Sequence, residues 1–163
     1  MKFRLYGLAL AVIAVLATAC EQRVQPIYNP TNVPIPQSLA FTSLEDIGEG
    51  IKRAGASQNW QMTDKGAGEI EAVLKIRTHK ANVRIDYSQI SYSITYVSSI
   101  NLLENGAGIH RNYNTWVRQL ESAINVNLQK LATTTKNEQL TTGDKAMMEA
   151  WKQAENTNDP LVL

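Results

Sequence analysis

The chain has 163 residues, of which 44% are apolar, and its 16 lysine and arginine residues nearly balance its 15 aspartate and glutamate residues. This composition is typical of one globular domain. The small net charge of +1 excludes a strongly basic nucleic-acid-binding protein, and the charged fraction of 19% is too low for a wholly disordered chain. A single cysteine, Cys20, excludes an internal disulfide framework.

The first 19 residues differ in character from the rest of the chain. Lys2 and Arg4 form a basic start, and an apolar run follows from Leu5 to Ala19. This pattern predicts a secretory signal peptide over residues 1–19. A transmembrane helix needs about 20 apolar residues, so the run is short for a membrane span, although an uncleaved anchor is the alternative.

The segment Leu16-Ala17-Thr18-Ala19-Cys20 resembles the lipobox of bacterial lipoproteins, with Leu16 one position further from the cysteine than in the usual pattern. The resemblance implies cleavage before Cys20, acylation of Cys20, and attachment to membrane lipid through it. Glu21 stands where lipoproteins of the inner membrane typically carry aspartate, so the resemblance implies a lipid-anchored protein of the bacterial envelope, in the outer membrane and facing the periplasm. The alternative is a secreted protein with a free cysteine.

Residues 20–40 contain four of the five prolines of the chain and no sustained apolar periodicity. Proline favours extended backbone and removes a hydrogen-bond donor, so the segment is predicted to be a tether. An alternative is that Ile27-Tyr28 and Val33-Pro34-Ile35 dock on the domain as an extended edge.

A helix is predicted over residues 43–54. Thr42 and Glu45 match a capping box, and the apolar residues Leu44, Ile47, Ile51 and Ala54 follow at helical spacing. Gly48 and Gly50 interrupt this helix. They indicate either low helix propensity, which we favour, or close approach of another backbone.

Nearly unbroken alternation from Glu69 to Ile100 predicts a three-stranded antiparallel meander, preceded by a short strand near Trp60. We expect residue 76 to pair with 83 and residue 85 to pair with 92. One face is apolar. The other face is polar and includes Lys75, Arg77 and Arg84.

The apolar period changes from Asn112 onward to three or four residues, which predicts an amphipathic helix to about residue 131. Tyr92, Tyr96, Tyr113 and Trp116 are expected to fill the interface between this helix and the sheet. Residues 133–163 are predicted to be a polar tail, with a short helix over 144–154 that presents Met147, Met148 and Trp151.

Together these elements predict an α+β domain over residues 41–132. Its order is α-β-β-β-β-α, and two helices cover one face of a four-stranded antiparallel sheet, because that two-layer arrangement buries the apolar side of every element.

Residues that could bind a partner gather where the long helix begins. His110, Arg111 and Asn114 place polar donors beside aromatic side chains, which suits a glycan, peptide or protein ligand. The alternative is that they cap and pack the helix start. Lys75, Arg77 and Arg84 are further candidates for partner contact on the polar sheet face. Neither histidine has the spacing of a metal site, and no catalytic motif is present, so we expect no cofactor, no metal and no enzymatic activity.

The tyrosine-rich strand, the glycine-containing loop and the run His110-Arg111-Asn112-Tyr113-Asn114 resemble segments of small bacterial envelope lipoproteins, and this resemblance implies no activity. The function predicted from the sequence is therefore a membrane-anchored, non-enzymatic binding or accessory module. Its expected partners are membrane lipid and another envelope protein or wall component, and not nucleic acid. The alternative is a protein that binds a small ligand or cell-wall glycan through the region His110–Asn114.

Overall fold

The computed structural model describes residues 23–156. The predicted signal peptide and Cys20, the predicted site of acylation, lie outside these residues, as does the end of the chain from residue 157. The predictions made for them therefore stay predictions.

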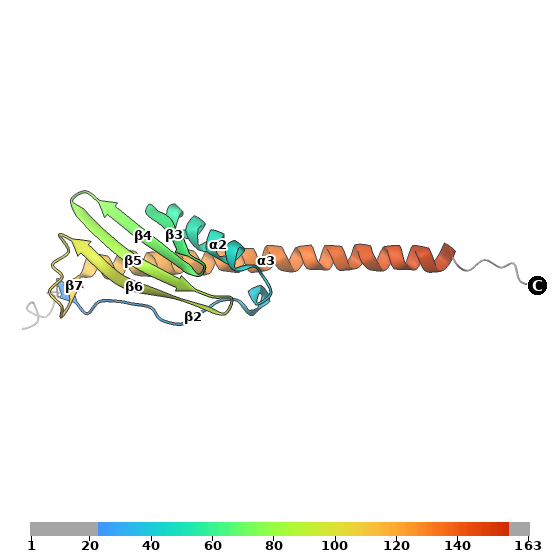
Figure 1. The fold of residues 1–163 in the computed structure, drawn as a ribbon, viewed down its shortest axis with the longest axis horizontal. Coiled ribbons are helices and arrows are strands. Elements are labelled where there is room, and N and C mark those ends of the chain that lie inside the picture. Colours follow the sequence, from blue (N-terminus) through green and yellow to red (C-terminus); the bar gives the residue numbers. More distant parts are fainter. Residues whose placement is uncertain (1–22, 157–163) are drawn as a thin grey trace, which may run out of the picture.

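The described chain folds into two layers (Figure 1), which confirms the α+β class. One layer is a five-stranded antiparallel sheet with the strand order β2-β6-β5-β4-β3, and the helices α2 and α3 cover its apolar face. The strands are β2 (Val33–Pro34), β3 (Trp60–Gly66), β4 (Glu69–Ile76), β5 (His79–Tyr87) and β6 (Ser91–Ile100). The helices are α2 (Leu44–Ser57), α3 (Arg111–Asn156) and the short 3-10 helix η2 (Gln37–Leu39).

The predicted single sheet of four strands is wrong in two respects. A fifth strand, β2, pairs with β6 at the edge of the main sheet. A separate two-stranded sheet joins β1 (Val24–Gln25) to β7 (Ile109–His110). Both additional pairings come from the proline-rich segment, which the predicted architecture left out of the domain.

The segment predicted to be a tether follows the edge of the sheet from residue 23 onward. The amide of Ile94 donates to the carbonyl of Pro30 at 2.8 Å, and the amide of Ile35 donates to the carbonyl of Ile90 at 2.9 Å. An unpartnered edge strand offers such donors and acceptors, and proline is tolerated at an edge because one side needs no donor. The structure therefore has the docked arrangement given as the alternative, with Ile35 buried in the core.

Both predicted register pairs, 76 with 83 and 85 with 92, are wrong. Ile76 lies opposite His79, and Ile85 lies opposite Ile94. The β4–β5 turn has only two residues, since Arg77 adopts a left-handed backbone with φ of 55° that tight hairpins require. The predicted and observed pairings differ by an even number of residues. The same side chains therefore face the core in both.

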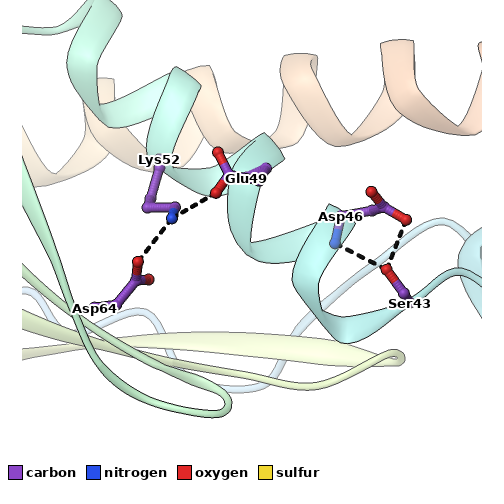
Figure 2. A network of polar contacts seen from close by, with 5 residues as sticks. All are labelled: Ser43, Asp46, Glu49, Lys52 and Asp64. Atoms are coloured by element: carbon purple, nitrogen blue, oxygen red, sulfur yellow. Dashed lines mark hydrogen bonds and ion pairs between the residues drawn. The ribbon is translucent and has the colours of Figure 1, made fainter.

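Helix α2 begins one residue later than its predicted capping box. The amide of Asp46 donates to the hydroxyl of Ser43 at 3.0 Å, so Ser43 is the N-cap (Figure 2). Further along the helix, Lys52 contacts Glu49 at 2.6 Å and Asp64 of β3 at 2.7 Å. These two carboxylates raise the pKa of the Lys52 ammonium group. The pair between Lys52 and Asp64 joins α2 to the edge strand of the sheet.

The glycines of α2 stand at close contacts rather than merely weakening the helix. A β-carbon on Gly48 would fall on the hydroxyl of Tyr87, and one on Gly50 would lie 3.2 Å from the Cδ2 atom of Leu128. The sheet and α3 therefore approach the backbone of α2 closely at these two positions. The neighbours at both glycines are side chains, so the alternative explanation, close approach of another backbone, is wrong, and the favoured explanation by low helix propensity stays a prediction.

We expect Gly68→Ala to lower the free energy of unfolding by about 1–3 kcal/mol. Gly68 has a φ of 82°, and a β-carbon there would lie 2.8 Å from the backbone oxygen of Tyr87. Urea unfolding followed by circular dichroism measures the loss. Gly106→Ala is the control, because Gly106 has a φ of 81° but a β-carbon there would have no atom within 4 Å. Equal losses in the two variants would contradict the crowding at Gly68.

Helix α3 does not end near residue 132 but runs to Asn156, so the predicted polar tail is helical at least that far. The first half of α3 packs on the domain, and this packing offsets the unfavourable free energy of helix nucleation. Each later residue only extends an existing helix. Threonine hydroxyls along the second half donate to the carbonyl four residues earlier, at Thr133, Thr134, Thr135, Thr141 and Thr142. Figure 1 shows this half projecting beyond the sheet and beyond α2.

Candidate functional site

Asn114, one of the candidate contact residues, links α3 to residues 26–28 of the N-terminal segment by hydrogen bonds. Its side chain is 7% exposed. Its Oδ1 atom accepts a hydrogen bond from the amide of Tyr28 at 2.9 Å, and its Nδ2 atom donates to the carbonyl of Pro26 at 2.9 Å. Both ends of the amide are therefore occupied by backbone groups of the protein itself.

His110 and Arg111 lie beside the same segment. His110 pairs with Val24 across the small sheet, and its Nδ1 atom accepts from the amide of Asn112 at 3.2 Å. Partial burial and the charges of Arg23 and Arg111 lower the pKa of His110, which favours the neutral ring that this hydrogen bond needs. Arg111 is exposed, and its amide donates to the carbonyl of Arg23 at 3.0 Å. These contacts hold the start of the described chain against the start of α3.

Tyr28, which the sequence placed only in the alternative of a docked segment, contacts α3. The guanidinium carbon of Arg118 lies 3.7 Å from the centre of its ring, and its hydroxyl donates to the Oε2 atom of Glu121 at 2.8 Å. The bond to Glu121 raises the pKa of the Tyr28 phenol. The apolar pair Ile27-Tyr28 indicated docking, but it did not identify Arg118 and Glu121 as the partners.

We expect Asn114→Ala to release the N-terminal segment from α3, because the amide of Tyr28 and the carbonyl of Pro26 lose their partner. A group left without a partner at such a site costs about 1–3 kcal/mol. Hydrogen exchange at the Tyr28 amide and the rate of tryptic cleavage after Arg23 should both rise. Thr115→Ala, an exposed site one residue on, is the control, and unchanged cleavage in Asn114→Ala would contradict this role.

The three candidate cations of the polar sheet face do not form one cluster. Arg84 lies in the middle of β5 and pairs with Asp86 at 2.9 Å. Lys75 and Arg77 are exposed at the β4–β5 turn, where Lys75 lies directly opposite Lys80. The structure therefore brings Lys75 and Arg77 together and separates Arg84 from them.

The described residues contain no evident centre for metal chemistry, since within 23–156 no three histidine, cysteine, aspartate or glutamate side chains come together. An open depression of about 530 Å³ lies at the other end of the sheet from His110. Its lining includes Asn32, Gly68, Asp86 and Tyr87, and none of His110, Arg111 and Asn114.

The projecting half of α3 carries large apolar side chains that are exposed to solvent. Leu140, Met147, Met148 and Trp151 are 57%, 70%, 60% and 65% exposed, and we call these four residues the distal stripe. At 100° per residue, three of the four, Leu140, Met147 and Trp151, fall within about 40° of one another around the helix axis. The predicted short helix included three members of the stripe. Leu140 was missed because residues 133–142 look too polar to be helical.

The charged side chains of this projecting helix are balanced, and two of them, Lys136 and Asp144, lie four residues from Leu140 and therefore on the side of the distal stripe. Between residues 136 and 152, the helix carries Lys136, Lys145 and Lys152 against Glu138, Asp144 and Glu149. Helices that lie on a membrane surface typically have a cationic polar face. A helix that inserts into a protein groove needs only large apolar anchors on one side, so the distal stripe suits a protein groove better than a lipid surface.

Within residues 23–156, neither helix combines the length and the apolar character needed to cross a membrane. Comparison of the chain with protein-family models, curated proteins and solved structures finds no match. The function is therefore argued from the residues and their geometry.

Proposed function

We propose that the protein is a membrane-anchored, non-enzymatic module of the bacterial envelope that presents the distal stripe of α3 to a protein partner. The observation that carries this proposal is the exposure of four large apolar side chains on a helix that leaves its own domain. A monomeric protein has no structural use for them there, because they pack on nothing within the domain.

The anchor in this proposal is the acylated Cys20, at an outer membrane and facing the periplasm. Cys20 precedes Arg23 by three residues, and Arg23 is bonded to the first residue of α3. The distal stripe lies at the other end of that helix. Since a helix rises 1.5 Å per residue, Trp151 lies about 60 Å along the axis from Arg111. Helix α3 would therefore act as a spacer between the lipid anchor and the partner.

Binding in an apolar groove also stabilises this helix. A single helix without tertiary contacts is marginal in water, so residues 133–156 gain order from a partner. Each large apolar side chain that becomes buried contributes about 1.5–3 kcal/mol. Four such side chains are enough for specific recognition without a large interface.

A photoreactive residue in place of Met147, introduced into the full chain in cells, tests the proposal. We expect one discrete protein adduct from this position. The same residue in place of Ala146, which points to another side of α3, should give none, because Ala146 is not part of the distal stripe. Equal adducts from both positions, or adducts of phospholipid alone, would overturn the proposal.

The alternative of a ligand or glycan site at His110–Asn114 gains no support from the geometry. Asn114 is bonded at both ends to the N-terminal segment, and the Nδ1 atom of His110 is bonded within its own helix turn. Neither side chain lines the open depression at the other end of the sheet.

A further inference from the structure

The end of the domain where the described chain begins forms one surface, which we call the basal end. It comprises Arg23, residues 75–80 and residues 97–111. The Nδ2 atom of Asn101 donates to the carbonyl of Thr78 at 2.8 Å, which joins the 101–108 loop to the β4–β5 turn. The amide of Arg111 donates to the carbonyl of Arg23, which adds the start of the described chain. Figure 1 shows β7 together with the ends of β4 and β6 at this side, opposite the projecting half of α3.

The basal end is strongly cationic, although the described chain is nearly neutral. It has one carboxylate, Glu104, and five cations, namely Arg23, Lys75, Arg77, Lys80 and Arg111. The remaining described residues have nine cations and twelve carboxylates. The N-terminus of α3 lies at the same end and adds the positive pole of its helix dipole, with no acidic residue in its first turn.

Two features of this surface lower the stability of the folded state. Lys75 lies directly opposite Lys80, and like charges at such positions repel each other. Arg77 and Leu103 have φ values of 55° and 53°, which residues other than glycine adopt at a cost. The left-handed backbone of Arg77 makes the two-residue turn, so the repulsion between Lys75 and Lys80 is the feature that a binding role explains and folding stability does not.

Exposed apolar side chains lie among these cations. Ile76 stands beside the β4–β5 turn, Ile100 lies opposite Lys80, and Leu103 projects from the 101–108 loop. A surface that mixes lysine and arginine with exposed aliphatic side chains suits the boundary between lipid headgroups and acyl chains. This composition contrasts with the balanced charge beside the distal stripe.

We propose that the basal end rests on the membrane and binds anionic phospholipid headgroups, while Ile76, Ile100 and Leu103 reach the boundary of the acyl chains. The inference rests on the lipid anchor of the proposed function. Residues from 23 onward are docked on the domain, so only the three steps from Cys20 to Arg23 separate it from that anchor. Three residues span at most about 11 Å. An anchored domain is thereby held with its cationic end close to the headgroups.

The test uses the full chain, purified from bacterial envelopes and reconstituted in neutral or anionic phosphatidylglycerol-containing vesicles. A nitroxide on Thr78→Cys reports collisions with a water-soluble nickel chelate. We expect protection from the chelate on anionic vesicles and its loss on neutral ones. A nitroxide on Ile90→Cys, at the other end of the sheet, should stay accessible on both. High salt screens the attraction between the cations and the anionic headgroups. It should therefore remove the protection of the label on Thr78→Cys when the cations of the basal end are unchanged.

A charge variant provides the second arm. Lys75→Gln, Arg77→Asn and Lys80→Gln together should abolish the protection of the label on Thr78→Cys, because each cation near an anionic surface strengthens binding about fivefold. The matched control removes Lys136, Lys145 and Lys152 from α3 by change to glutamine and should leave the protection intact. Thermal unfolding by circular dichroism checks that both triple variants are folded.

The outcomes separate this inference from the proposed function. Flotation with both kinds of vesicle but no protection at position 78 overturns the inference and leaves the anchor standing. Flotation with anionic vesicles alone, with protection, supports the inference and removes the lipid anchor. Flotation with neither kind of vesicle overturns both. Protection that survives high salt and the basal triple variant overturns the role of the cations.

Discussion

Tyr92→Ala is expected to lower the free energy of unfolding by about 3–5 kcal/mol. Tyr92 lies in β6, is 1% exposed, and contacts α3. Its hydroxyl donates to the Oδ1 atom of Asn125 at 2.8 Å, and burial raises the pKa of the phenol, which keeps this donor protonated. Truncation removes the ring from the core and leaves a cavity between the sheet and the helix. Urea unfolding followed by circular dichroism measures the effect.

Tyr92→Phe separates the ring from the hydroxyl. It keeps the packing and removes the hydroxyl, whose one proton is shared between the Oδ1 atom of Asn125 and the carbonyl of Glu121, so its cost should be about 1 kcal/mol. A loss of less than 1 kcal/mol in Tyr92→Ala would contradict the role of Tyr92 in joining β6 to α3. Equal losses in the two variants would assign the effect to the hydroxyl rather than to packing.

Leu140→Glu combined with Trp151→Glu is expected to weaken binding of the partner by at least about 100-fold. Two large apolar side chains contribute about 3–6 kcal/mol when they are buried, and a factor of ten corresponds to 1.4 kcal/mol. The domain itself should unfold at the same urea concentration, because both side chains lie outside the core. Titration calorimetry with the protein identified by crosslinking measures the affinity.

Ala146→Glu is the matched control for this double variant. It also adds a carboxylate to the exposed half of α3, but on a different side of the helix, so binding should remain within a factor of a few. If Ala146→Glu weakens binding as much as the double variant, the effect comes from charge or from helix stability. The distal stripe would then not be the binding surface.

The two proposed surfaces lie at opposite ends of one helix. Arg111 is part of the basal end, and Trp151 is part of the distal stripe. A rigid element between them would set the distance at which a partner is held from the membrane. The two tests are independent because their variants change different residues and are measured with different probes, a vesicle and a protein.

Several elements follow from local patterns alone. The alternation from Glu69 to Ile100 sets which side chains face the core, since neighbouring residues of a strand point to opposite faces. The helical spacing of Tyr113, Val117 and Leu120 sets the buried side of α3 in the same way. Tyr92 and Tyr113 are accordingly buried between sheet and helix, as predicted. The α+β class needs no more than these patterns.

The candidate site residues show where such patterns are insufficient. The run His110–Asn114 was identified by its concentration of polar groups, but its partners are backbone atoms of residues 23–28, more than 80 positions away. The cationic basal end joins three parts of the sequence that show no common motif. Neither arrangement can be derived from spacing along the chain.

Register, edges and helix length were decided by contacts between distant residues. Arg77 in a left-handed turn sets the β4–β5 register, although that conformation is rare outside glycine. The open edge of β6 draws the proline-rich segment onto the sheet, because its backbone groups need partners. The packed half of α3 lets residues that looked like a tail continue as helix. Alternation and periodicity are local properties of the chain. Hydrogen-bond partners and helix nucleation depend instead on contacts between residues that are distant in the sequence and that only the tertiary structure brings together.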